Sequence, residues 1–318
     1  MKKILLTIVG MFAMNMSSFA LSTTTVLLYH GESVTTYAAE DIAQAMDASV
    51  DGDVIVLNEG SYPGFDITKK ITVKGAGEKT LITGVVNIDI SGVPTLTANL
   101  LEYMTFQKEV NVKAAITGMK VVQCYCQTNF FLLANVYDSL IDRCFLQRLV
   151  VNYNYDNSSA KPLSVRNSIV RTYSGADSNL RGSSSQNVSF VNCIFYSAMD
   201  SMGSVINCIL NKAAATSVYG SISATVFVNS YIQNNGTISI NTTTCTETAC
   251  YHGDAELKYD SDDISANSYY GNDNTIIGPL GGSTPYTLVP SVPHVTDASL
   301  KVDLKKQELN ATLTVSPN

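Results

Sequence analysis

The stretch FVNCIFYSAMDSMGSVINCIL, Phe190–Leu210, contains the tripeptide Asn-Cys-Ile twice, fifteen positions apart. Two cysteines in matching contexts are compatible with a disulfide, with half of a metal site, or with two copies of one structural unit. The third reading is favoured because a six-residue pattern with Cys or Ser at its fourth position recurs along the chain. The strong copies are V-V-Q-C-Y-C (121–126), I-D-R-C-F-L (141–146), V-R-N-S-I-V (165–170), F-V-N-C-I-F (190–195), V-I-N-C-I-L (205–210) and F-V-N-S-Y-I (227–232), with weaker copies V-V-N-I-D-I (85–90) and L-E-Y-M-T-F (101–106).

The spacing of these copies predicts a solenoid. Strong copies start 15 to 25 residues apart, and a period near 20 with β-branched residues indicates a parallel β-helix. The first and sixth positions are always apolar, although strict alternation along a strand would place them on opposite faces. A one-residue bend at position three, where Asn tolerates left-handed backbone angles, would return both to the interior. The Cys or Ser at position four would then stack just inside this corner.

The fifth position is large and apolar in every strong copy, yet alternation points it outward. One such residue per coil would form a contiguous apolar stripe, which indicates either a covering segment or an interaction surface. The sequence leaves open a covering loop or C-terminal segment on one side and a binding face on the other. The stripe consists of Tyr125, Phe145, Ile169, Ile194, Ile209 and Tyr231.

The cysteines of the repeat are predicted to be free thiols. Cys124 and Cys144 would lie on successive coils, as would Cys193 and Cys208. Parallel stacking separates their Cβ atoms by about 4.8 Å, which is longer than a disulfide prefers. Buried thiols that act as small hydrophobic groups fit this arrangement better.

Two further cysteines lie in the loop sequence C-T-E-T-A-C. Cys245 and Cys250 have the freedom to close a disulfide there, and together with His252 they form an alternative, incomplete zinc ligand set. The seven cysteines are an odd number, so at least one stays unpaired within the chain.

The first twenty residues predict export. MKKILLTIVGMFAMNMSSFA combines a basic start, a short apolar run and a small-x-small ending, the pattern of a secretory signal peptide cleaved after Ala20. The apolar run is shorter than a membrane span requires, so the mature chain is expected in the periplasm, on the cell surface or outside the cell. A net charge of −7 with 15% charged residues argues against nucleic acid as a partner. Tryptophan is absent, so a glycan site would have to use the 17 tyrosines.

The N-terminal part is predicted to form a helix followed by the first coil. Residues 38–49, AAEDIAQAMDAS, have apolar residues at helical spacing, and D-G-D-V-I-V-L, E-G-S-Y and K-K-I-T-V-K-G-A-G (69–77) follow. This succession resembles the N-terminal entry of pectin-lyase-like right-handed parallel β-helix proteins, most closely secreted members from Gram-negative bacteria with no assigned function. The resemblance covers residues 37–77 by motif and extends to about residue 240 by repeat. It implies an all-β, single-stranded right-handed parallel β-helix with an N-terminal helical cap.

The C-terminal part has a different composition. Residues 278–295 are rich in Pro and Gly and cannot continue regular coils. S-L-K-V-D-L and E-L-N-A-T-L-T-V flank a Lys305–Gln307 turn and predict a β-hairpin. The expected organisation is therefore a signal peptide (1–20), a lead-in strand (21–37), a parallel β-helix with its helical cap (38–277), and a closing segment with a hairpin (278–318).

The candidate functional residues are few. Enzymes of the resembled family bring acids from adjacent coils together, and the pattern here offers Asp142, with Arg143 and Arg166 nearby, and Glu102 from a weak copy. No position matches the catalytic motifs of that family. The excursion N-Y-N-Y-D-N-S-S (152–159) suggests glycan contacts from Tyr153, Tyr155 and Asp156, with Asp142 and Arg166 as further candidates. Acidic residues that calcium prefers occur at Asp260, Asp262 and Asp263.

These observations favour a non-catalytic exported protein that contacts extracellular or cell-envelope polysaccharide through loops and a lateral face. No cofactor is expected, apart from the calcium alternative. Two other functions stay open. One is a polysaccharide lyase or glycoside hydrolase of the same fold, and the other is a protein-binding or adhesive role for the apolar stripe.

Overall fold

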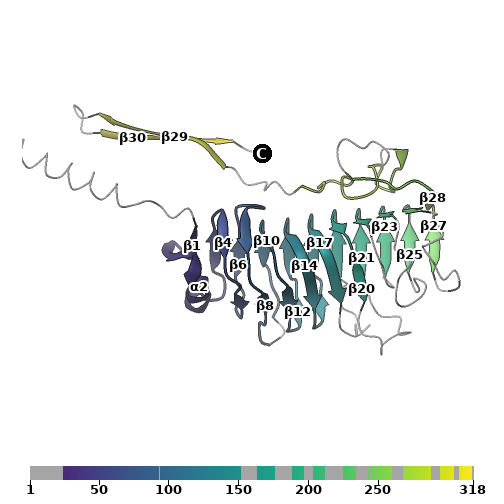
Figure 1. Ribbon diagram of the computed structural model, residues 1–318, viewed down its shortest axis with the longest axis horizontal. Coiled ribbons are helices and arrows are strands. Elements are labelled where there is room, and N and C mark those ends of the chain that lie inside the picture. The colour runs from purple at the N-terminus through teal and green to yellow at the C-terminus, as the bar shows by residue number, and fades with distance from the viewer. Residues whose placement is uncertain are drawn as a thin grey trace, which may run out of the picture.

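The protein is a parallel β-solenoid, as predicted from the repeat (Figure 1). Strands make up 47% and helices 5% of the computed structural model. Coils stack along one axis, so that strands far apart in sequence pair in parallel on two long sheets. The structure describes residues 24–92, 94–151, 163–175, 188–196, 203–211, 225–233, 243, 245–259, 268–287, 294–303 and 308–316.

The first long sheet has twelve strands, and from its third strand onward it contains one strand per coil. Its order is β2 (Ser33–Ala38), β1 (Thr25–His30), β3 (Val54–Leu57), β6 (Thr72–Lys74), β9 (Leu101–Glu102), β13 (Lys120–Val122), β16 (Leu140–Asp142), β18 (Leu163–Arg166), β21 (Val188–Val191), β23 (Ser204–Ile206), β25 (Val226–Val228) and β27 (Thr246–Thr248).

The second long sheet has fourteen strands and follows the first around each coil. Its main path is β4 (Gly60–Tyr62), β7 (Thr80–Ile82), β10 (Thr105–Phe106), β14 (Tyr125–Leu132), β17 (Phe145–Val151), β19 (Ile169–Val170), β22 (Ile194–Phe195), β24 (Ile209–Leu210), β26 (Tyr231–Gln233) and β28 (Tyr251–Gly253). A branch joins β5 (Asp66–Ile67), β8 (Val86–Ile88) and β11 (Val110–Val112) to β14, and β20 (Tyr173–Gly175) to β17. Two short strands, β12 (Ile116–Thr117) and β15 (Val136–Tyr137), pair separately.

A helical cap closes the N-terminal end of the coil. The predicted helix is present as η1 (Ala39–Asp41) followed by α2 (Ile42–Ala48), and its residues Ile42, Ala45 and Met46 are buried. Lys69 Nζ donates to the carbonyl oxygens of Met46, Asp47 and Ser49 at 3.1, 2.7 and 2.6 Å. These carbonyls lie at the end of α2, so Lys69 neutralises the negative end of the helix dipole.

The bend predicted at position three of the repeat is confirmed. Every position-three residue of the six strong copies has a left-handed φ between 45° and 56°, and the weak copy at 101–106 and the last coil have it too. The bend directs positions one and six into the interior, where each of these residues is at most 2% exposed. The bent residues are Tyr103, Gln123, Arg143, Asn167, Asn192, Asn207, Asn229 and Ala249.

The weak copy assigned to residues 85–90 is wrong. Asn87 lies in β8, which pairs with β5 and β11 on the branch of the fourteen-stranded sheet, and it has no left-handed φ. The equivalent coil instead enters the twelve-stranded sheet at Val73, opposite Leu101. A strand of three residues with an Asn at its centre imitates the corner pattern in sequence but lies elsewhere on the coil.

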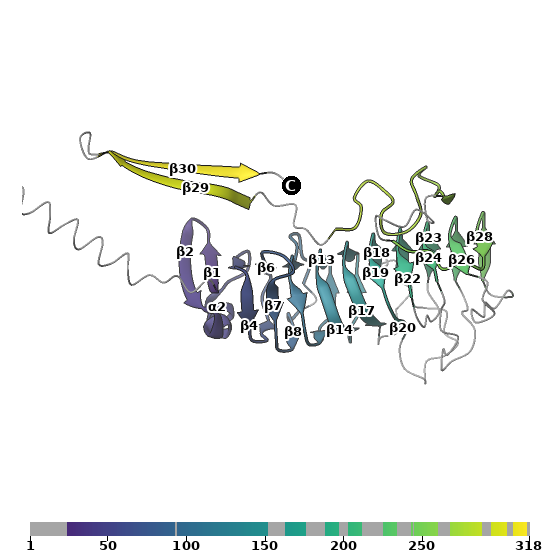
Figure 2. The same ribbon diagram turned by 45° about the horizontal axis from the view of Figure 1, so that its top comes forward.

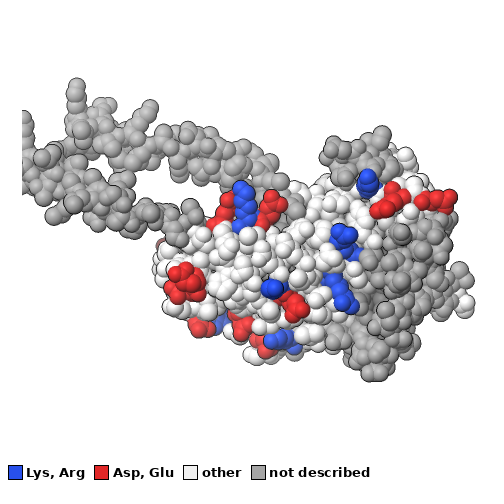
Figure 3. Space-filling view, viewed as in Figure 1, with Lys and Arg blue, Asp and Glu red and all other residues white. Residues whose placement is uncertain are grey.

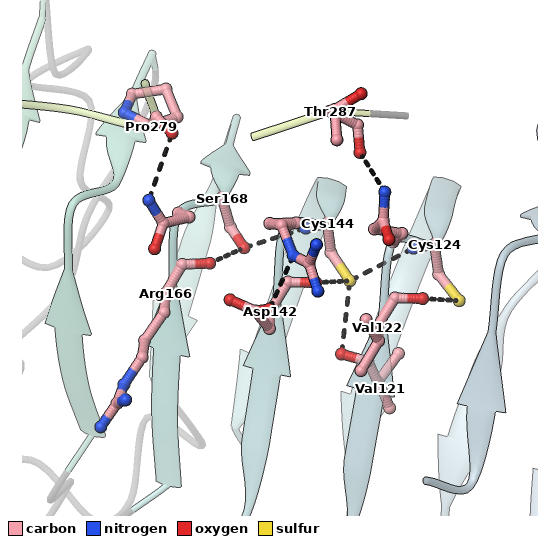
Figure 4. A network of polar contacts seen from close by, with 12 residues as sticks. Val121, Val122, Cys124, Asp142, Cys144, Arg166, Ser168, Pro279 and Thr287 are labelled. Carbon is pink, nitrogen blue, oxygen red and sulfur yellow. Dashed lines mark hydrogen bonds and ion pairs between the residues drawn. The ribbon is translucent and has the colours of Figure 1, made fainter. Parts of the chain in front are cut away.

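Position four forms a ladder of hydrogen bonds inside the corner (Figure 4). The backbone N–H of Cys124 donates to Cys144 Sγ at 3.4 Å, and the N–H of Cys144 donates to Ser168 Oγ at 3.0 Å. Each side chain in turn donates to a carbonyl two residues earlier, Cys144 to Asp142 and Ser168 to Arg166. In the strong copies position four therefore suits a small side chain that both accepts and donates, as Cys and Ser do.

The repeat cysteines are free thiols, as predicted. Cys124, Cys144, Cys193 and Cys208 are fully buried and form no disulfide. Burial raises the pKa of the Cys144 and Cys193 thiols well above its ordinary value. They are therefore structural acceptors rather than reactive groups.

We expect Cys144→Ala to destabilise the protein more than Cys144→Ser. Alanine leaves the buried N–H of Cys124 without its acceptor, which costs about 1–3 kcal/mol, whereas serine supplies the same contact that Ser168 and Ser230 already make. The midpoint of urea unfolding, followed by circular dichroism, measures the difference. Equal midpoints for the two variants would contradict the ladder.

The apolar stripe at position five is covered by the C-terminal part of the chain. Residues 268–287, here called the strap, run back along the coil from its C-terminal end toward the middle (Figure 2). Ile277 of the strap and the preceding Leu257 join one buried cluster with the stripe residues Ile169, Ile194, Ile209 and Tyr231, each at most 1% exposed. Of the two alternatives, the covering segment is therefore correct for this part of the stripe.

Side chains at the bent corner hold the strap in place. Asn207 Nδ2 donates to Asn272 Oδ1 at 3.0 Å, and the N–H of Asn272 returns a bond to Asn207 Oδ1 at 3.1 Å. Asn167 Nδ2 donates to the carbonyl of Gly281 at 2.6 Å. Further along, Gln123 Nε2 donates to the carbonyl of Thr287 at 2.9 Å (Figure 4). The backbone of these corner residues thus forms the bend, while their side chains bind the strap.

The last coil is polar where the others are apolar. Glu247 pairs with Phe227 of the preceding coil, and His252 pairs with Ile232, so both occupy core-lining positions. Their side chains meet across the coil, with His252 Nε2 2.8 Å from Glu247 Oε2, and remain 41% and 30% exposed. The pair closes the interior with polar groups at the end of both long sheets.

The predicted C-terminal hairpin is confirmed. Strand β29 (His294–Asp303) pairs antiparallel with β30 (Glu308–Ser316), with one irregularity between Val295 and Asp297. The two strands form a sheet of their own.

Candidate glycan-binding face

The branch of the fourteen-stranded sheet presents a row of amide side chains. Asp66 of β5, Asn87 of β8, Asn111 of β11 and Phe131 of β14 lie side by side in register. The residues on either side of Asn87, Asn111 and Phe131 along their strands are buried, so alternation directs the row outward. We call these four residues, with Asn129 of β14 and Arg148 of β17, the amide face.

A chain of hydrogen bonds fixes the orientation of these amides. Asn87 Nδ2 donates to Asp66 Oδ1 at 2.8 Å, and Asn111 Nδ2 donates to Asn87 Oδ1 at 3.1 Å. An ionised carboxylate only accepts, so the Asn87 amide must turn its NH₂ toward Asp66. Its oxygen then faces Asn111, which in turn must donate. The chain therefore ends at Asn111 Oδ1, an acceptor beside Phe131.

An aromatic ring and an arginine continue the amide face beyond Asn111. Phe131 is half-buried between Asn111 and Val150 of the neighbouring strands. A register shift in β14 between Cys126 and Asn129 places Asn129 opposite the exposed Arg148. The arrangement places an aromatic ring next to the Asn111 amide, with Asn129 and Arg148 two residues earlier along β14 and β17. Sugar recognition uses such a combination of a ring and hydrogen-bonding groups.

The predicted acid and base candidates do not converge. Asp142 and Arg166 lie in register on neighbouring strands of the twelve-stranded sheet. Asp142 Oδ2 nevertheless pairs with Arg143 Nε at 2.8 Å (Figure 4), while Arg166 Nε donates to Ser164 Oγ at 3.0 Å. The side chains of Asp142 and Arg166 are thus committed to different partners.

Glu102 is neutralised in the same way. Its carboxylate accepts from Asn99 Nδ2 at 2.6 Å and lies 3.4 Å from Lys74 Nζ. Strand β13, with Val122 at the matching position, separates Glu102 from Asp142. The two acids therefore lie two strands apart, and each is paired with its own cation.

Several predicted site residues lie outside the described residues. These are the loop residues Tyr153, Tyr155 and Asp156 and the acidic residues Asp260, Asp262 and Asp263. In the sequence the loop follows directly after β17, the strand that carries Arg148. Within the part of the chain that the structure describes, no group of three His, Cys, Asp or Glu residues is arranged to hold a metal ion.

The Cys245–Cys250 disulfide stays a prediction. Cys250 is a half-buried free thiol in this structure, and its Sγ lies 3.7 Å from the carbonyl oxygen of Thr248. Cys250 occupies position four of the last coil, directly after the left-handed Ala249. It therefore ends the corner ladder rather than lying in a loop, and His252 pairs with Glu247 instead of joining the cysteines.

The amide face was not predicted from the sequence, although two of its strands share a recognisable pattern. Val86-Asn87-Ile88 and Val110-Asn111-Val112 share the pattern apolar-Asn-apolar, and both form three-residue strands with the Asn facing outward. Aligning these two triplets would have identified the row.

No family model, no curated protein and no solved structure matches this chain. The solenoid architecture therefore rests on the structure itself, and the resemblance to pectin-lyase-like proteins stays an expectation. Among the described helices, none has the length and apolar character needed to cross a bilayer.

Proposed function

We propose that this protein is an exported, non-catalytic β-helix protein that binds a glycan on its amide face. The proposal is supported above all by one observation: an outward ladder of hydrogen-bonded amides runs directly up to the half-buried ring of Phe131. A linear glycan laid along this row would stack on the ring and exchange hydrogen bonds with the amides and Arg148.

The two other functions have less support. A lyase or hydrolase of this fold would use acids that share a site, whereas Glu102 and Asp142 are paired with cations two strands apart. An adhesive role of the apolar stripe would need an open surface, whereas Ile169, Ile194 and Ile209 are buried under the C-terminal segment.

We expect Phe131→Ala to weaken glycan binding at least tenfold, because loss of the ring removes about 1.4 kcal/mol or more of contact. The measurement is titration of the purified protein against oligosaccharides selected from a glycan array. Ile206→Ala is the matched control, since Ile206 is also an outward, half-buried apolar residue but lies on the twelve-stranded sheet. Binding that Phe131→Ala leaves unchanged, or that both variants weaken equally, would contradict the proposal.

A further inference from the structure

Charged residues of both signs lie on and beside the amide face, in nearly equal number. The exposed Asp89 and Lys113 follow β8 and β11 directly, and Arg148 lies on β17. The carboxylate of Asp66 accepts from Asn87, and Glu109 Oε1 accepts from Asn129 Nδ2 at 3.4 Å. On the side of the molecule shown in Figure 3, acids and bases are likewise interspersed over a largely uncharged surface. Such a surface creates no strong field of one sign.

The direction of the hydrogen bonds from Asn111 to Asn87 and from Asn87 to Asp66 determines which ligand groups can bind at the end of this row. Because Asp66 can only accept, both amides donate toward it, and the free end of the ladder at Asn111 Oδ1 is an acceptor. A sugar hydroxyl can donate to this oxygen. A carboxylate cannot, and the acids Asp66, Asp89 and Glu109 outnumber the bases Lys113 and Arg148 around the row, so a uronate gains no net attraction there.

We propose that the amide face selects a neutral glycan and discriminates against glycans that contain uronic acids. This inference rests on the proposed function and adds the class of ligand. A ligand hydroxyl donates to Asn111 Oδ1 while an adjacent sugar ring lies against Phe131. The discrimination arises because a carboxylate cannot donate to Asn111 and finds more acids than bases around the row, whereas a hydroxyl at the same place donates and carries no charge.

The test is an array that carries neutral oligosaccharides (glucans, mannans, xylans and galactans) beside uronate oligosaccharides (galacturonans and alginates). We expect binding to neutral members only, with affinities that change less than threefold between 50 and roughly 500 mM salt, because screening acts on charged contacts. We expect Asn111→Leu, which removes the terminal acceptor at similar volume, to weaken neutral binding about tenfold, the effect of roughly 1.4 kcal/mol. Circular dichroism verifies that the variant is folded.

The outcomes separate the two proposals. Binding of uronates in preference to neutral glycans, abolished by Phe131→Ala, would overturn the ligand class and leave the glycan function standing. Neutral binding that Asn111→Leu does not weaken would also overturn it, because the acceptor would then have no role. Absence of binding to both classes would overturn the glycan function itself.

Discussion

Asn207→Val is expected to lower the free energy of unfolding by about 4 kcal/mol. Asn207 has a φ of 55°, where a β-branched residue is strained by roughly 1–2 kcal/mol. The substitution also removes both side-chain bonds to Asn272 and leaves the N–H of Asn272 without its acceptor, at a further cost of roughly 2 kcal/mol. The strap would lose one of its clamps at the same time.

Asn207→Gly separates the two contributions. Glycine adopts a positive φ without strain, so this variant keeps the bend and loses only the clamp. We expect about half of the effect of Asn207→Val. Urea unfolding followed by circular dichroism and tyrosine fluorescence measures both, and the 17 tyrosines give a signal in a chain without tryptophan. If Asn207→Gly and Asn207→Val lowered the free energy of unfolding equally, the left-handed φ at residue 207 would add no strain to the valine variant.

The double variant Glu247→Leu/His252→Leu is expected to convert the C-terminal end of the coil into an association surface. The two positions line the core in every preceding strong copy of the repeat, and here they hold a polar pair at the end of both sheets. Two leucines would expose apolar surface beside β27 and β28, the terminal strands of the two long sheets among the described residues. Apolar surface at the end of a sheet promotes edge-to-edge pairing.

Light scattering after size-exclusion chromatography tests this expectation. The leucine variant should show a larger, concentration-dependent mass than the unmodified protein at the same concentration. Glu247→Gln/His252→Gln is the matched control, because it removes the charges and keeps the end polar. If the leucine variant and the unmodified protein had the same mass at every concentration, the polar pair would have no role in keeping the ends apart.

The repeat predicted most of the coil because it combines three local requirements. A left-handed residue, a small hydrogen-bonding residue and two apolar residues must occur within six positions, and the sequence repeats all of them from Val121 to Ile232. The corner, the free thiols and the stripe followed from these requirements. The copy at 85–90 was misassigned because Asn at the centre of a short outward strand gives the same letters as Asn at the corner.

The amide face and the strap were harder to predict for physical reasons. Neither Asp66 nor Asn111 belongs to the six-residue pattern. Both align with Asn87 through the register of β5, β8 and β11, and strands of only two or three residues are too short for that register to be predicted from sequence. The strap has no period, since its Gly and Pro residues adapt to the coil beneath them. Gly271 lies so close to Asn207 that any side chain there would collide with it, a requirement visible only in three dimensions.

The strap also sets an order of events during folding. Coils form from neighbours in sequence and can add one after another as the chain is synthesised, but the bond from Gln123 to Thr287 joins residues 164 positions apart. The strap can dock only after every coil between these residues is in place. Until then Ile169, Ile194 and Ile209 face water, so the partly folded coil exposes an apolar stripe that disappears only when the strap, synthesised after all the coils, has docked.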